Sequence, residues 1–261
     1  MTASQSLRLA RLFVLALRQH FYECAGTWWF VATLTIQAVL TPLIGLFVWS
    51  AVFPAEQYVV QYYVALLVVQ LMTQAFEQHT FASKIYDGTI SHDLLKPQPI
   101  VIDPLGGNTA VRLWLMLMGL PLVIVAAAAF DVSFAWPNVL LALPALLLAA
   151  ALTFVWNFCL AMTAFWTERV YAIVDFGSYA TFLLGGAVAP LSFMPEPWRS
   201  VGEVLPFYAM LGFPAEVATG EASGGAIVAG LGIQLGWTIL LVAAAMRLWR
   251  AGVRRYTVVG A

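Results

Sequence analysis

Long apolar stretches separated by short polar segments dominate the chain. Charged residues bound these stretches: 32 uncharged residues lie between Glu23 and Glu56, and 20 lie between Glu56 and Glu77. About 20 apolar residues are enough for a helix to cross the hydrocarbon core of a bilayer. The pattern therefore predicts six membrane-spanning helices, over residues 28–50, 58–76, 113–130, 139–165, 170–193 and 226–247.

The composition agrees with this interpretation. Of the 261 residues, 62% are hydrophobic and 10% are charged, whereas a soluble domain carries about 25% charged residues. The mean hydropathy is +0.87. Two cysteines, Cys24 and Cys159, are too few for a disulfide framework, and we expect both to be buried. We predict an all-α polytopic membrane protein in which residues 1–261 form a single transmembrane domain.

The basic residues predict the orientation of the spans. Eleven of the twelve lie before the first span, between spans two and three, between spans four and five, or from the end of span six onward. The exception is Arg199, which lies between spans five and six. Segments rich in lysine and arginine tend to stay in the cytoplasm. Six spans with this distribution predict that both termini are cytoplasmic.

The segment before the first span, residues 4–22, has an amphipathic pattern. Arg8, Arg11 and Arg18 share one helical face, while leucine and phenylalanine side chains occupy the others. Because three charges disfavour insertion across the bilayer, we predict a helix that lies at the membrane interface.

The segment 77–112, between the second and third spans, is the longest polar insertion and carries both lysines of the chain. Its centre resembles a short helix between the flexible Gly88 and the helix-stopping Pro97. We expect one side of this helix to be apolar and to contact a cytosolic partner. The apolar positions are Ile90, Leu94 and Leu95.

The segment 194–225, between the fifth and sixth spans, is mostly apolar but interrupted by prolines. Proline removes a backbone donor and breaks helices, so this segment is too irregular to span. We predict short helices that enter the outer leaflet and return. The prolines are Pro195, Pro197, Pro206 and Pro214.

Three short motifs follow one another along the chain. They are Gly88-x-Ile90-x-x-x-Leu94-Leu95-x-Pro97, then Pro190-Leu-Ser-Phe-Met-Pro195 followed by Leu205-Pro206-Phe207 and Pro214, and finally Gly252-Val-Arg-Arg-Tyr256. In this order, and placed against six spans, they resemble the permease subunit of a type-2 ABC exporter. The resemblance to this ABC-2 transporter family covers essentially the whole chain and favours its branch of small six-helix permeases.

The resemblance implies partners and a function. The segment from Tyr86 to Leu95 would be a coupling helix that sits in a groove of an ATP-binding subunit. Two such subunits and a second permease, identical or related, would complete an exporter in a bacterial inner membrane, and no nucleic acid is expected as a partner. The cargo would be amphipathic or hydrophobic, such as a drug, a lipid or a glycolipid. The implied coupling residues are Gly88, Ile90, Leu94, Leu95 and Pro97.

The chain lacks the sequence signature of an ATPase. A phosphate-binding loop needs Gly-Lys-Ser/Thr, but Lys84 follows Ser83 and Lys96 follows Leu95. The three histidines also lack the spacing of metal ligands. We therefore expect no enzymatic activity, metal or cofactor on this chain, with ATP and magnesium held by the partner subunit.

Semi-polar residues recur inside two of the predicted spans. Tyr63, Gln70 and Gln74 follow one another at spacings of seven and four, which places them on one helical face, and Tyr179 and Phe182 are three apart. The resemblance places the second and fifth spans along the translocation route, so these five residues are candidates for lining it. Hydrogen bonding between helices is the alternative role.

Asp175 is the one acidic residue expected inside a span. An acid within the membrane suggests an alternative function, that of a self-sufficient secondary transporter coupled to protons. The absence of an inverted repeat argues against this alternative. Arg169, about a turn and a half away, indicates instead that Asp175 lies near the cytoplasmic interface.

Overall fold

The structure is a computed structural model that describes residues 3–53 and 56–256, without the side chains of residues 3, 4, 78 and 79. The described residues form helices joined by short connections, and no strand occurs among them, which confirms the all-α prediction. In chain order the helices are α1 (Ala3–Gly26), α2 (Trp28–Val52), α3 (Gln57–Thr73), α4 (Glu77–Tyr86), α5 (Ile90–Leu94), α6 (Ile102–Ala129), α7 (Trp136–Met162), α8 (Val170–Leu184), α9 (Trp198–Val204), α10 (Pro206–Met210), α11 (Gly212–Thr219) and α12 (Gly224–Arg255).

Four of the helices in the described part of the chain are long and apolar enough to cross a membrane. They are α2, α6, α12 and α7 with the 3-10 turn that follows it. The apolar helices α3 and α8 have 17 and 15 residues, which is shorter than the roughly 20 needed for a perpendicular crossing. Six apolar helices thus occupy the six predicted ranges, and four of them have spanning length.

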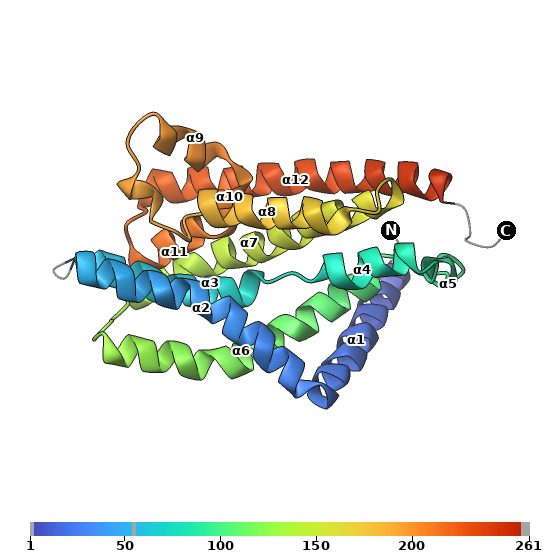
Figure 1. The fold of residues 1–261 in the computed structure, drawn as a ribbon, viewed down its shortest axis with the longest axis horizontal. Helices are drawn as coiled ribbons and strands as arrows, with labels where there is room; N and C mark the ends of the chain where they lie inside the picture. The colour runs from blue at the N-terminus through green and yellow to red at the C-terminus, as the bar shows by residue number, and fades with distance from the viewer. Residues whose placement is uncertain (1–2, 54–55, 257–261) are drawn as a thin grey trace.

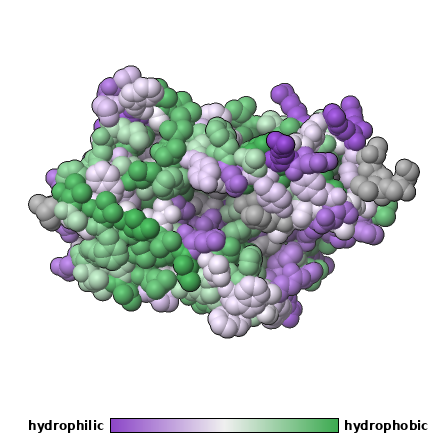
Figure 2. Space-filling view, viewed as in Figure 1, coloured by the Kyte–Doolittle hydropathy of each residue, from purple (hydrophilic) through white to green (hydrophobic). Residues whose placement is uncertain are grey.

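The apolar helices lie side by side along the long axis of the molecule (Figure 1). The start of α1, the helices α4 and α5 and the end of α12 gather at one end, and α9 and α11 lie at the other. Hydrophilic residues concentrate at the end that carries α4 and α5 (Figure 2). The helix α1 packs obliquely along α6 and carries the amphipathic pattern predicted for residues 4–22.

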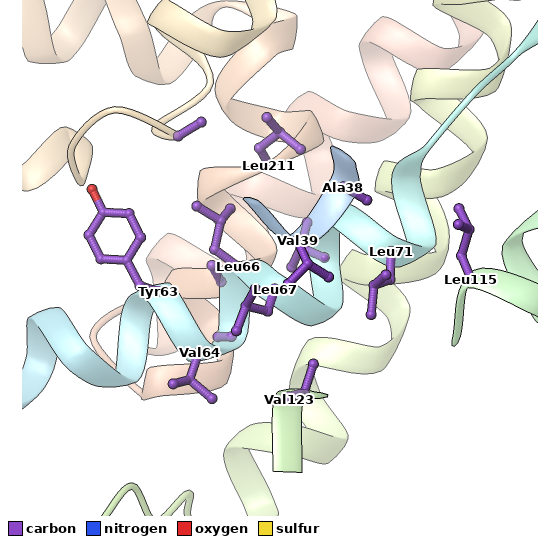
Figure 3. Packing of buried hydrophobic residues seen from close by; sticks show 14 of the residues in the cluster. Ala38, Val39, Tyr63, Val64, Leu66, Leu67, Leu71, Leu115, Val123 and Leu211 are labelled. Atoms are coloured by element: carbon purple, nitrogen blue, oxygen red, sulfur yellow. The ribbon is translucent and has the colours of Figure 1, made fainter. Parts of the chain in front are cut away.

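The helix α3 is at the centre of the bundle and packs against α2, α6, α7 and α11. Its side chains Leu66, Leu67 and Leu71 are fully buried (Figure 3). They meet Val39 of α2 and Leu115 of α6, among others. Between helices in a bilayer, such contacts stabilise mainly through van der Waals packing, because lipid tails are as apolar as leucine.

The second and third predicted spans have different bounds in the structure. The helix α3 ends at Thr73 rather than at residue 76, because Gln74 adopts an extended conformation with ψ of 141°. Its carbonyl accepts hydrogen bonds from Arg112 Nε at 2.8 Å and Asn108 Nδ2 at 3.3 Å. The helix α6 begins at Ile102 rather than at residue 113, with Arg112 inside it. A charged residue therefore marks no helix end here.

The fifth predicted span, residues 170–193, is also shorter in the structure. The helix α8 ends at Leu184, and Gly186 follows in the left-handed region with φ of +86°, which favours glycine. Tyrosine hydroxyls of α3 hold the chain that follows: Tyr62 donates to the Gly186 carbonyl at 2.8 Å, and Tyr63 donates to the Val188 carbonyl at 2.7 Å. The helix ends where it is fixed to α3.

The remaining ranges agree more closely with the prediction. The helices α2 and α7 cover the predicted ranges 28–50 and 139–165, with α7 continued by the 3-10 turn Thr163–Phe165. The helix α12 continues past residue 247 to Arg255, because arginine favours helices and stabilises their C-terminal ends. The segment 194–225 contains the short helices α9, α10 and α11, and its insertion into the outer leaflet stays a prediction.

Candidate coupling and translocation sites

The connection between α4 and α5 is organised by Gly88. This residue has φ of +73°, a left-handed conformation in which a residue with a side chain would be strained. The carbonyl of Gly88 accepts a hydrogen bond from the Tyr256 hydroxyl at 2.9 Å. Gly88 and Tyr256 belong to the first and last sequence motifs, so the fold brings these two motifs together.

The helix α5 has five residues and corrects the predicted coupling helix in two respects. The predicted segment from Tyr86 is divided, since Tyr86 ends α4 and α5 begins only at Ile90. Ile90 is 0% exposed and packs in the protein's own interior, whereas Leu94 is 39% and Leu95 is 84% exposed. The three residues therefore share no common outward side, and only the two leucines are open to a partner.

A network of ion pairs fixes α5 to its neighbours. Lys84 of α4 donates to Asp93 of α5 at 3.0 Å and to Asp103 of α6 at 2.8 Å. Asp93 also accepts a hydrogen bond from Lys96 at 2.6 Å. Burial raises the pKa of Asp93, but the hydrogen bonds from Lys96 and Lys84 outweigh it and hold the pKa below its usual value. Asp93 is therefore ionised at neutral pH.

The same network reaches α1 through His20. The imidazole Nε2 lies 3.0 Å from Asp103 Oδ1, and Nδ1 lies 2.8 Å from Glu23 Oε2. The hydrogen bond to Asp103 raises the pKa of His20 above its ordinary value in spite of partial burial. Helices α1, α4, α5 and α6 are thus joined by charged side chains at one end of the molecule.

A second connection joins α4 to α8. The Tyr86 hydroxyl donates to the carbonyl of Thr167 at 2.9 Å and accepts from the backbone N–H of Val170, the first residue of α8, at 3.2 Å. A displacement of α4 would therefore be transmitted directly to the start of α8.

A cavity of about 230 Å³ lies between α2, α3, α7 and α8, and we call it the polar pocket. Three of the residues predicted to line the translocation route, Gln70, Gln74 and Phe182, meet there. Most of its other polar side chains were not identified from the sequence, because their convergence depends on packing. These include Gln37, Thr41, Asn157, Ser178 and Thr181.

Two other predicted route residues lie outside the polar pocket. Tyr63 is completely buried in α3 and is occupied by its hydrogen bond to Val188. Tyr179 is exposed on α8. A neighbouring apolar groove of about 340 Å³ shares Thr41 and Phe182 with the polar pocket and continues along α2. The lining of the two cavities offers amide, hydroxyl and apolar groups but no charge.

Two charged residues that seemed to mark span boundaries are covered by the fold near the break between α3 and α4. Glu77 is buried, and Arg112, whose charge acts on Glu77, is half-buried. Burial raises the pKa of Glu77 to about 7. Asp175 is exposed on α8, so it is not enclosed by the fold. Among the described side chains, no group of histidine, cysteine and acidic residues could hold a metal ion.

Comparison with known proteins identifies the family. A family model described as ABC-2 family transporter protein matches residues 40–260, which include α5, the polar pocket apart from Gln37 and Ala38, and the short helices α9 to α11. Neither the comparison with curated proteins nor that with solved structures found a match. The match confirms the resemblance seen in the sequence motifs and accounts for the apolar helices as parts of an integral membrane protein. The chain belongs to the family of ABC-2 transporter proteins.

Proposed function

We propose that the chain is the permease subunit of an ATP-driven exporter in a bacterial inner membrane. Its cargo is an amphipathic or hydrophobic molecule, such as a drug, a lipid or a glycolipid. ATP and magnesium are bound and ATP is hydrolysed on two separate ATP-binding subunits. A second permease, identical or related, completes the transporter.

Two exposed leucines at the end of α5 are the observation that carries this proposal. Leu94 and Leu95 are apolar, yet they lie open to solvent at the hydrophilic end of the molecule. Covering a leucine fully contributes about 1.5 to 3 kcal/mol to association. The pair therefore suits a groove of an ATP-binding subunit, while Gly88, Ile90 and Pro97 shape and anchor the element rather than contact the partner.

The contacts of α4 and α5 supply a route for mechanical coupling. Lys84 joins α5 to α6 through two carboxylates, and Tyr86 joins α4 to the start of α8. Movement of α5 by the ATP-binding subunit would therefore shift helices on both sides of the bundle. One of them, α8, lines the polar pocket.

The polar pocket supports the proposed place of the substrate route. Polar groups that face lipid have no hydrogen-bonding partners there and cost free energy. A second permease packed against α2 and α8 would separate Gln70, Gln74 and Phe182 from the lipid and enclose a path between the two subunits. Tyr179 would lie at this interface, and Tyr63 would support the wall from inside.

The test uses the complex of the chain with its ATP-binding subunit in proteoliposomes. We expect Leu94→Asp and Leu95→Asp to reduce permease-stimulated ATP hydrolysis and transport at least tenfold, with unchanged amounts of permease in the membrane. Val201→Asp places the same charge at an exposed position of α9, at the opposite end, and should leave coupling intact.

Unchanged transport by both leucine variants would contradict the proposed coupling site. Transport by the chain alone, without ATP and abolished by Asp175→Asn, would replace the proposal with the secondary-transporter alternative. The two outcomes can be told apart, because the first is measured on the complex with the ATP-binding subunit and the second on the chain alone.

A further inference from the structure

A cavity of about 300 Å³ lies among the short helices at the end opposite α5. Its walls come from α9, α10, α11 and the first half of α12. We call it the outer pocket. It shares no lining residue with the polar pocket or the apolar groove, so it is separate from the proposed substrate route.

The outer pocket contains a buried carboxylate with unused hydrogen-bonding capacity. Glu216 of α11 is only 9% exposed, and it accepts a hydrogen bond from the hydroxyl of Tyr208 through Oε2. Its other oxygen, Oε1, is buried and has no hydrogen-bond partner among the described residues. A buried acceptor left in this state is costly, which makes it a candidate for ligand binding.

The arginine that lines the outer pocket already forms an ion pair with another residue. Arg199 lines the outer pocket, but its Nε donates to Glu203 at 2.9 Å, and within the described chain Glu216 makes no ion pair. Glu203 and Glu221 also line the cavity, so three acidic residues face one arginine there. Burial raises the pKa of Glu216 to about 7, so a cation beside it would favour its ionised form, in which the acidic residues outnumber the arginine and attract positive charge.

The remaining lining favours an organic cation over a hydrated inorganic one. The rings of Tyr208 and Phe213 lie beside Glu216, and aromatic faces attract ammonium groups. Ala226 and Ala229 of α12 form a small apolar wall that leaves room for a few methylene groups. A water molecule occupies about 30 Å³ in the liquid, so a cavity of this size admits a small amine.

We propose that the outer pocket binds an organic ammonium ion, whose N–H groups donate to Oε1 of Glu216. Two sources carry this chemistry, a free alkylamine in solution and the headgroup of an aminophospholipid. The inference concerns binding to this chain alone and does not depend on ATP coupling.

The first experiment titrates the full chain in detergent with ethanolamine and follows binding by calorimetry. We expect saturable binding that ethylene glycol, a neutral analogue of similar size, does not reproduce. Glu216→Gln keeps the size of the side chain and removes its charge, and should weaken binding at least tenfold. Glu56→Gln, the same change at an exposed glutamate that does not line the pocket, should leave it unaltered.

A second variant protects the test against misfolding at Glu216. Ala229→Leu fills the cavity from α12 without altering a charge, and it should also weaken ethanolamine binding. Ethanolamine binding at wild-type affinity in both folded variants would overturn the proposal. It would also be overturned if the wild-type chain showed no saturable binding, neither of ethanolamine in detergent nor of aminophospholipid in nanodiscs.

Nanodiscs distinguish the two sources. If the headgroup is the occupant, phosphatidylethanolamine should compete with added ethanolamine and phosphatidylglycerol should not. If free amines are the occupant, ethanolamine should bind equally in both membranes. Either result supports an ammonium site, provided that Glu216→Gln removes it.

Discussion

Glu77 is an acidic side chain that the fold encloses at the start of α4. It is 2% exposed, and burial raises its pKa from an ordinary 4.5 to about 7. An acid whose pKa is raised by folding stabilises the protein below its unfolded pKa, and this contribution is lost as pH rises through the folded pKa. We expect the thermal unfolding temperature in detergent to fall between pH 5 and pH 8, and Glu77→Gln to make the fall smaller.

Other titratable groups near Glu77 also change the stability of the protein between pH 5 and pH 8. The contribution of Glu77 is therefore measured by comparing the variants with the wild type. The raised pKa of His20 also makes stability decline as pH rises, because a base that is easier to protonate in the folded state stabilises it at low pH. Glu168→Gln, at an exposed site, is the matched control. Identical pH profiles for Glu77→Gln and wild type would contradict the assignment. The charged groups that share the cavity or face Glu77 are His20, Glu23, Lys84, Asp103 and Arg112.

At the scale of elements, α5 depends on a lysine that belongs to another helix. Lys84→Met would remove both connections from α4, to Asp93 and to Asp103, while leaving Leu94 and Leu95 in place. We expect the ATP-binding subunit to bind with affinity within about threefold of wild type, but ATP-driven transport to fall severalfold. Binding and transport are measured separately on the same reconstituted complex.

Lys96→Met is the control for this prediction. It removes the other lysine of the polar segment 77–112, whose ion pair to Asp93 spans only three residues. Exposed pairs of this kind contribute about 0.2 to 1 kcal/mol, so transport should change little. Equal losses in the two variants would show that charge in the loop matters, rather than the connection between α5 and α6.

The apolar helices could be predicted from the sequence, but their ends could not. Placing boundaries at charged residues works for α2, whose flanking charges lie outside the helix. It fails for α6, because Arg112 lies inside this helix, is half-buried, and donates to the carbonyl of Gln74, which directly follows α3 and is 38 residues away in sequence. The residues of the polar pocket also differ in how far they could be predicted. The spacing of Gln70 and Gln74 along one helix could be read from the sequence, whereas Gln37 and Thr41 join them only through the packing of helices.

Which side chains of α5 face the interior of the protein could not be predicted from the sequence either. A five-residue helix has too few positions for an apolar face to be assigned from periodicity. Ile90 is drawn inward by the aromatic cluster that includes Phe81 and Phe158. Only the tertiary structure separates this anchoring residue from the exposed leucines.

At the scale of the whole molecule, α2 and α8 form a face that suits a second permease. Large apolar side chains are exposed on both helices. Ile44 and Val48 of α2 and Phe182 of α8 line the apolar groove next to the polar pocket, and Tyr179 of α8 is exposed as well. Lipid can cover the apolar side chains but cannot satisfy the amides and hydroxyls between them. A protein partner satisfies both requirements.

Cross-linking tests this face, because both native cysteines are buried and free. We expect Tyr179→Cys to form a covalent pair of chains in native membranes under mild oxidation, detected by a mass shift on non-reducing gels. A pair of twice the chain mass indicates an identical second permease, and a product of another mass that requires a co-expressed chain indicates a related one. Val228→Cys, equally exposed on α12, is the control. Efficient cross-linking through Val228→Cys but not Tyr179→Cys would place the interface on α12 and leave the polar pocket facing lipid, which contradicts the proposed route.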